Sequence, residues 1–185
     1  MVLYINCCPR KESRTKRLAN AVLQKLGEYE EVNLYEAVLL PIDENRIKER
    51  NSLLESGKLD AEEFKLARQF ASADEIVIAA PFWDLSFPAK LKLYIENIYI
   101  TGIVSSYDEN GMPKGLCNAE RLYYVTTSGG PFDGRYSFDY FRTLCIDYFN
   151  IPEVKLIKAE MLDVVGFDPE EIIEKAICDI RVSPL

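Results

Sequence analysis

A run of five apolar residues, Ile76–Ala80, constrains this chain more than any other feature, because Pro81 and two large aromatic residues follow it at once. The run is too short for a helix and lacks the alternation of a half-exposed strand, so it predicts a strand buried on both faces. A helical pattern begins after Pro88. This order places Phe82 and Trp83 at the carboxyl edge of an open sheet, where α/β folds bind ligands and where aromatic rings suit a planar cofactor.

Similar apolar runs alternate with helical patterns along all 185 residues. The predicted strands are 2–6, 32–35, 75–80, 122–126 and 154–159. The predicted helices are 15–26, 45–54, 61–71, 88–99, 138–149 and 169–181. This alternation predicts one domain over residues 1–185, an α/β fold with a doubly wound, five-stranded parallel sheet and helices on both faces. We expect the flavodoxin-like strand order 2-1-3-4-5. Asn110-Gly111 also predicts a tight turn.

Composition narrows the chemistry. The net charge of -8 argues against nucleic acid or an anionic membrane as the main partner, and no apolar run is long enough to predict a membrane span. The five cysteines form no CxxC pair and no secretion signal precedes the first strand, so we expect free thiols, no metal site and a cytoplasmic protein. The chain has no histidine, which favours chemistry that an organic cofactor carries out itself.

Three predicted loops meet at the carboxyl edge of such a sheet. The first, residues 6–17, is basic and carries Ser13 and Thr15 at a helix amino terminus, so it indicates either a phosphate site or an ordinary capped helix. The second, residues 81–85, indicates a stacking surface or a pair of core aromatic residues. The third, residues 126–132, contains Gly129-Gly130 and indicates either close backbone approach to a ligand or a simple turn.

These three loops together resemble those of the FMN-dependent NADH-azoreductase and NAD(P)H:quinone oxidoreductase family. Ser13-Arg14-Thr15 is similar to the Ser-x-Ser element of the family's phosphate loop, and Cys8 stands where the family often has a further serine. Pro81–Leu85 resembles the segment that packs against the isoalloxazine ring. Thr127–Gly130 resembles the Ser-x-Gly-Gly loop, and the 107–116 segment also fits the family pattern.

The resemblance implies a two-electron flavin enzyme without a catalytic side chain of its own. FMN would be the cofactor, NADH or NADPH the electron donor, and a quinone, azo or nitro compound the acceptor. The implied FMN-binding residues are Cys8, Arg10, Ser13, Arg14, Thr15, Pro81, Phe82, Trp83, Asp84, Leu85, Thr127, Ser128, Gly129 and Gly130. The expected walls of the substrate pocket are Tyr107, Phe132 and Tyr136. The family also implies a homodimer, for which Tyr99, Ile100 and Ile103 are candidate contacts.

Two other functions remain open at this stage: a flavodoxin-type electron carrier and a non-catalytic flavin-binding sensor. The chain departs from the family at Trp83 and Asp84, which replace a Tyr-Asn pair. Asp84 either faces the flavin ring, where its charge would lower the reduction potential, or caps the following helix or points to solvent.

Overall fold

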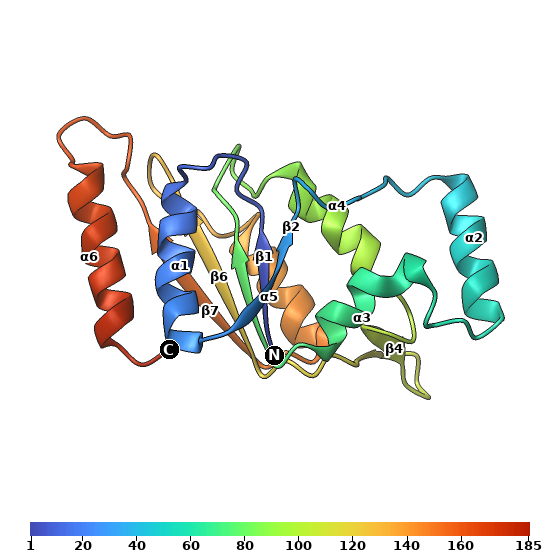
Figure 1. The fold of residues 1–185 in the computed structure, drawn as a ribbon. Coiled ribbons are helices and arrows are strands. Elements are labelled where there is room, and N and C mark those ends of the chain that lie inside the picture. Colours follow the sequence, from blue (N-terminus) through green and yellow to red (C-terminus); the bar gives the residue numbers. More distant parts are fainter.

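A computed structural model describes all 185 residues, and its centre is a parallel sheet of five strands (Figure 1). The strands are β1 (Val2–Asn6), β2 (Tyr29–Asn33), β3 (Glu75–Ala79), β6 (Arg121–Thr127) and β7 (Glu153–Ala159). Their order, β2-β1-β3-β6-β7, is the predicted 2-1-3-4-5 order of a flavodoxin-like fold. The central strands are buried on both faces, as their continuous apolar sequences predict.

Helices cover both faces of the sheet. The helices α1 (Arg14–Leu26) and α6 (Pro169–Val182) pack on one face. The other face is covered by α3 (Lys65–Ser72), α4 (Ala89–Ile98), α5 (Phe138–Thr143) and the π-helical segment η2 (Leu144–Phe149). The helix α2 (Glu44–Glu55) lies farther out, beyond α4, and the 3₁₀ turn η1 (Glu62–Phe64) leads into α3. No helix is both long enough and apolar enough to cross a membrane.

The outlying α2 is held by a part-buried ion cluster. Arg46 and Arg50 both pair with Glu63, and both also donate to the side-chain oxygen of Asn97 in α4. Arg50 additionally donates to the Glu96 carbonyl at 3.1 Å. These bonds satisfy the buried guanidinium groups and fix α2 against the carboxyl end of α4, so this polar cluster serves architecture.

The structure corrects two predicted elements. The second strand was expected at 32–35, but β2 spans Tyr29–Asn33. This edge strand begins with three exposed residues and so lacks an apolar signal, and the Asn33 side chain accepts from the Tyr35 amide to turn the chain. The predicted helix 138–149 is α5 followed by η2, and Asn150 ends it in the left-handed conformation.

A small hairpin follows α4. Its strands β4 (Ser105–Tyr107) and β5 (Pro113–Gly115) flank the predicted Asn110-Gly111 turn, in which Gly111 has a φ of 76°. The hairpin lies near the amino ends of the central strands, and its β5 strand packs against η2. A Cβ atom on Gly115 would lie 2.1 Å from the Asn150 amide nitrogen, so only glycine allows this contact.

Candidate cofactor site

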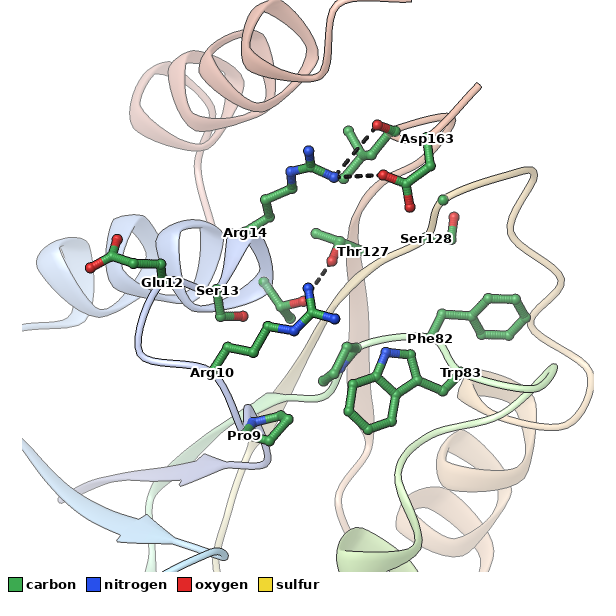
Figure 2. A pocket seen from close by; sticks show the side chains of 14 residues that line it. Pro9, Arg10, Glu12, Ser13, Arg14, Phe82, Trp83, Thr127, Ser128 and Asp163 are labelled. Atoms are coloured by element: carbon green, nitrogen blue, oxygen red, sulfur yellow. Dashed lines mark hydrogen bonds and ion pairs between the residues drawn. The ribbon is translucent and has the colours of Figure 1, made fainter. Parts of the chain in front are cut away.

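A cavity of about 440 Å³ opens at the carboxyl ends of the central strands (Figure 2). It lies among the loops that follow β1, β3 and β6, together with the loop between β7 and α6. The residues that line it are Pro9, Arg10, Glu12, Ser13, Arg14, Thr15, Pro81, Phe82, Trp83, Thr127, Ser128, Gly129, Leu162 and Asp163. A volume of this size suits a small organic ligand rather than a single ion.

One end of the cavity gathers unpaired backbone amides and hydroxyl groups. The backbone N–H groups of residues 10–15 have no acceptor within the chain, although they adjoin the start of α1. Ser13 caps the helix by accepting from the Lys16 amide at 3.3 Å. The Thr15 and Thr127 hydroxyl groups lie 2.6 Å apart and join the first turn of α1 to the end of β6. Unpaired amides at a helix amino terminus attract negative charge.

The basic residues of this loop differ in their partners. Arg14 donates to Asp163 at 2.9 Å, and Arg17 pairs with Glu170 and Glu174 of α6. Arg10 has no carboxylate partner. Figure 2 shows the Arg10 side chain in the cavity, while that of Arg14 turns toward Asp163. Arg10 is therefore the cation of this loop that is free to meet an anionic ligand in the cavity.

A strained aromatic turn, Trp83–Ser86, adjoins the cavity, and its first residue, Trp83, lines it. Trp83 and Ser86 bond each other through both backbone groups, at 2.8 Å each. The two residues between them, Asp84 and Leu85, have φ values of 49° and 65°, so the segment is a two-residue turn of the type I′ class. Their amides have no acceptor in the chain, and the Trp83 side chain is 41% exposed. The turn therefore presents free donors beside an accessible ring.

The glycine loop after β6 is braced by the loop after β7. Met161, Leu162 and Asp163 donate their amides to the carbonyls of Gly130, Ser128 and Gly129, respectively. A Cβ atom on Gly129 would lie 2.5 Å from Asp163 Oδ2, whereas one on Gly130 would meet no atom within 4 Å. The sequence interpretation left two roles open for this glycine pair, close approach of a ligand or a simple turn. In the structure Gly129 makes room for a neighbouring side chain.

Most of the residues predicted to bind a cofactor come together in the cavity. Those that line it are Arg10, Ser13, Arg14, Thr15, Pro81, Phe82, Trp83, Thr127, Ser128 and Gly129. Four others are adjacent in sequence but do not line it: Cys8, Asp84, Leu85 and Gly130. Asp84 is exposed and forms no side-chain bond, and Pro88 occupies the cap position of α4, so the capping hypothesis for Asp84 is wrong.

The predicted substrate-pocket residues are not all in one place. The Phe132 ring packs edge-on against the ring of Phe82, with 5.0 Å between the centroids. Tyr136 is 60% exposed, and its carbonyl accepts from the Ser86 hydroxyl at 2.6 Å. Tyr107 lies in the β4–β5 hairpin, at the opposite end of the sheet from the cavity. Within one chain, Tyr107 therefore forms no part of this site.

Sequence reasoning missed four lining residues: Pro9, Glu12, Leu162 and Asp163. Pro9 and Glu12 lie within the loop that was predicted, so only their individual roles were overlooked. Leu162 and Asp163 come from a fourth loop, after β7, which was not considered. The strand order contained the signal, because β7 neighbours β6 and its carboxyl end must open at the same edge of the sheet.

The thiols near the cavity are not reactive groups. All five cysteines are free, and Cys7 and Cys8 are buried at the end of β1. Burial raises the pKa of the Cys7 thiol to about 12. Burial also raises the pKa of Cys8, despite a hydrogen bond from Ser13 that lowers it. A nucleophilic cysteine needs a lowered pKa, so neither thiol is suited to covalent chemistry.

Comparison with known proteins gives consistent matches over nearly the whole chain. A family model described as a flavodoxin-like fold matches residues 1–182. The FMN-dependent NADH:quinone oxidoreductase 2 of Clostridium acetobutylicum is 36% identical, and the match covers 95% of this chain and 94% of that protein. The FMN-dependent NADH:quinone oxidoreductase of Coprothermobacter proteolyticus is 33% identical over the same shares of the two chains.

Solved structures agree on the fold. An azoreductase from Bacillus anthracis strain Sterne superimposes with a TM-score of 0.83 at 21% identity, covering 97% of this chain and 96% of that chain. An FMN-dependent NADH-azoreductase from Bacillus anthracis strain Ames Ancestor, in complex with FMN, gives a TM-score of 0.79 at 24% identity, covering 97% and 95%. The chain belongs to the flavodoxin-like fold family and, within it, to the FMN-dependent NADH:quinone oxidoreductases.

Proposed function

We propose that this protein is an FMN-dependent NAD(P)H oxidoreductase that reduces quinones and, by the same route, azo and nitro compounds. The observation that carries the proposal is the polarity of the cavity. Unpaired amides and the free Arg10 cation lie at one end, and the Pro81–Trp83 wall lies at the other. FMN has the same polarity, with a phosphate dianion at one end and a planar ring system at the other.

The residues present fit the phosphate end of FMN. The amides of residues 10–15 supply several donors, and Ser13 and Thr15 supply hydroxyl groups. Arg10 adds a full positive charge in a chain whose net charge is -8. FAD lacks a terminal phosphate, so we expect it to bind more weakly at such a site.

The residues at the other end fit a planar ring. Trp83 lines the cavity with an exposed aromatic surface, and the amides of Asp84 and Leu85 in the adjoining turn have no acceptor in the chain. Thr127, Ser128 and Gly129 of the neighbouring loop also line the cavity, and the Thr127 carbonyl accepts from the Phe82 amide at 3.0 Å. When bound, FMN supplies hydride transfer from NAD(P)H to the acceptor, and the protein contributes orientation, stacking and shielding from water.

The direct test is reconstitution followed by anaerobic reduction. Apoprotein mixed with FMN should give a flavin spectrum that survives gel filtration, and NADH should bleach it within one mixing time. Addition of menadione should restore the colour. Bound FMN that NADH reduces only slowly would favour a flavodoxin-type carrier. Bound FMN that neither donor nor acceptor affects would favour a sensor, and no FMN binding at all would refute the proposal.

Arg10 allows a matched test of the phosphate end. We expect Arg10→Gln to raise the Kd for FMN about tenfold while leaving the Kd for riboflavin, which has no phosphate, unchanged. Lys11→Gln removes the same charge from the same loop, but Lys11 does not line the cavity. It should change the FMN affinity by less than about threefold. Equal losses in the two variants would assign the effect to net charge rather than to Arg10.

We also propose that both substrates use the cavity in turn, so that steady-state kinetics are ping-pong. The support is that Trp83 is the one exposed aromatic residue among those that line the cavity. Double-reciprocal plots at several quinone concentrations should be parallel. Intersecting lines would require donor and acceptor to be bound together and would contradict a shared position.

A cytoplasmic homodimer is the proposed working state. Five free thiols suit a reducing compartment.

The candidate dimer contact Ile100 is only 4% exposed, so it is a core residue. Exposed apolar side chains lie instead after β2, at Tyr35, Val38, Leu40 and Ile47. Tyr107 could wall a substrate site only from a second copy. Light scattering at micromolar concentration should give about twice the chain mass, and an active monomer would exclude this arrangement.

A further inference from the structure

The segment 131–137, here called the rim loop, carries two aromatic side chains beside the cavity but is anchored from outside it. Its Phe132 amide donates to Glu160 Oε2 at 2.8 Å. Its Tyr136 carbonyl accepts from the Ser86 hydroxyl at 2.6 Å. Glu160 directly follows the edge strand β7, and Ser86 belongs to the aromatic turn. The rim loop is therefore positioned between two rigid elements.

A lysine completes the anchor at Phe132. Lys158 Nζ lies 2.8 Å from Glu160 Oε1 and 5.6 Å from the centroid of the Phe132 ring. Glu160 thus accepts one bond from the ammonium group and one from the Phe132 amide. Both bonds hold the pKa of Glu160 below its usual value, so the carboxylate is charged at neutral pH. The Glu160 charge therefore neutralises an ammonium group that lies over the Phe132 ring.

The anchored ring extends the wall of the cavity. Phe82 lines the cavity on the side away from Arg10 and Ser13 (Figure 2), and Phe132 packs edge-on against it. The two rings form one apolar contact beside the cavity, and the exposed Tyr136 belongs to the same rim loop as Phe132. A planar acceptor that enters on this side meets apolar rings and an ammonium group whose charge is already balanced.

We propose that Glu160 is a positioning and specificity-determining residue. It fixes Phe132 as an acceptor-facing wall, and by neutralising Lys158 it makes the enzyme favour uncharged quinones over anionic acceptors. The inference rests on the proposed function, because it assigns the acceptor class of that same site. It requires no contact between Glu160 and the acceptor.

The test compares a neutral and an anionic quinone of similar ring size, menadione and 1,2-naphthoquinone-4-sulfonate. In Glu160→Gln, Phe132 loses its charged acceptor, so the KM for menadione should rise. The acceptor ratio is defined here as kcat/KM for the sulfonate divided by kcat/KM for menadione. The unpaired Lys158 should raise this ratio about fourfold, as expected for one exposed charge at contact distance. The double variant Lys158→Gln/Glu160→Gln should return this ratio to the wild-type value while the menadione KM remains high.

β7 provides a matched control. Glu153 pairs with Lys155 at 3.0 Å, with the same two-residue spacing, at the opposite end of the strand. Glu153→Gln changes the net charge equally and should leave the acceptor ratio unchanged. The FMN Kd and the rate of NADH bleaching, measured first on the wild type, test the proposed function separately. If those are normal and Glu160→Gln lowers kcat/KM equally for both quinones, or matches the control, the inference is wrong.

Discussion

Replacing Gly129 by alanine should destabilise the protein only as long as Asp163 is present. A Cβ atom at position 129 would lie 2.5 Å from Asp163 Oδ2 and 3.2 Å from its Cγ. Arg14 and the Asp163 amide, which donates to the Gly129 carbonyl at 2.9 Å, both hold that side chain in place. The methyl group must therefore displace the Asp163 carboxylate and weaken its bond to Arg14.

The expected magnitudes follow from two opposing effects. Overpacking costs about 1–3 kcal/mol, and loss of the exposed ion pair adds at most about 1 kcal/mol. Gly129 does not have a positive φ, so alanine gains about 0.4–1 kcal/mol by restricting the unfolded chain. We expect a net loss of about 1–2 kcal/mol for Gly129→Ala. In an Asp163→Ala background the contacts with Oδ2 and Cγ are gone and only the 3.3 Å contact with the Cβ atom remains, so the same substitution should become neutral or stabilising by at most about 0.5 kcal/mol.

Urea unfolding measures this coupling in four apoproteins: the wild type, Gly129→Ala, Asp163→Ala and the double variant. The four m-values must agree for the comparison to hold. Gly130→Ala is the control, because its methyl group would meet nothing within 4 Å and its effect should be the same in both backgrounds. The sign change for Gly129→Ala is the decisive result. Equal destabilisation with and without Asp163 would show that the clash lies elsewhere and would refute the role given to this glycine.

Three further outcomes are expected. Leu85→Gly should raise the unfolding free energy by about 1 kcal/mol, and the Tm by about 2–4 °C, because Leu85 is 58% exposed and has a φ of 65°. Burial raises the thiol pKa of Cys7 and Cys117 to about 12, so between pH ~9 and ~12 these thiols ionise in the unfolded chain but not in the folded one. Their contribution to the unfolding free energy should therefore be constant below pH ~8.5 and fall between pH ~9 and ~12. A urea midpoint that stays flat from pH 8 to 11 would contradict this. Asp84→Asn should raise the flavin midpoint potential by at most about 20 mV, because the carboxylate is solvated; a larger shift would place it against the ring.

The architecture followed from the sequence wherever burial leaves a continuous apolar signal. The strands β1, β3 and β6 contain such runs, whereas Lys155 and Lys158 interrupt the apolar residues of β7. Once these strands are parallel and joined by right-handed crossovers, their order is nearly determined. The start of the edge strand β2 was not predicted because Tyr29, Glu30 and Glu31 are exposed and give no apolar signal. The π-helical geometry of η2 was not predicted, because residue propensities do not distinguish backbone hydrogen bonds between residues five apart from those between residues four apart.

The site was predictable at the level of loops and not at the level of partners. Carboxyl ends of neighbouring parallel strands meet at one edge, so the convergence of three loops follows from strand order alone. The partner of Arg14 does not, because Asp163 is 149 positions away in the chain. Motif similarity placed Arg14 and Thr15 at a phosphate. The structure adds that Arg14 and Thr15 already have partners in Asp163 and Thr127.

These partners change how charge is distributed along the cavity. Asp163, in the loop between β7 and α6, pairs with Arg14 of α1, and Glu170 and Glu174 of α6 pair with Arg17 of α1. These ion pairs join α1 to that loop and to α6 without any ligand. Of the two arginines that line the cavity, Arg10 is the one without an ion-pair partner, and the amides of residues 10–15 also have no acceptor in the chain. A phosphate can therefore bind there without breaking an ion pair, whereas recruiting Arg14 would first cost its bond to Asp163. On the proposed function we therefore expect selectivity for a phosphorylated flavin to depend chiefly on Arg10 and the backbone amides, while the ion pairs of Arg14 and Arg17 hold the loop in place.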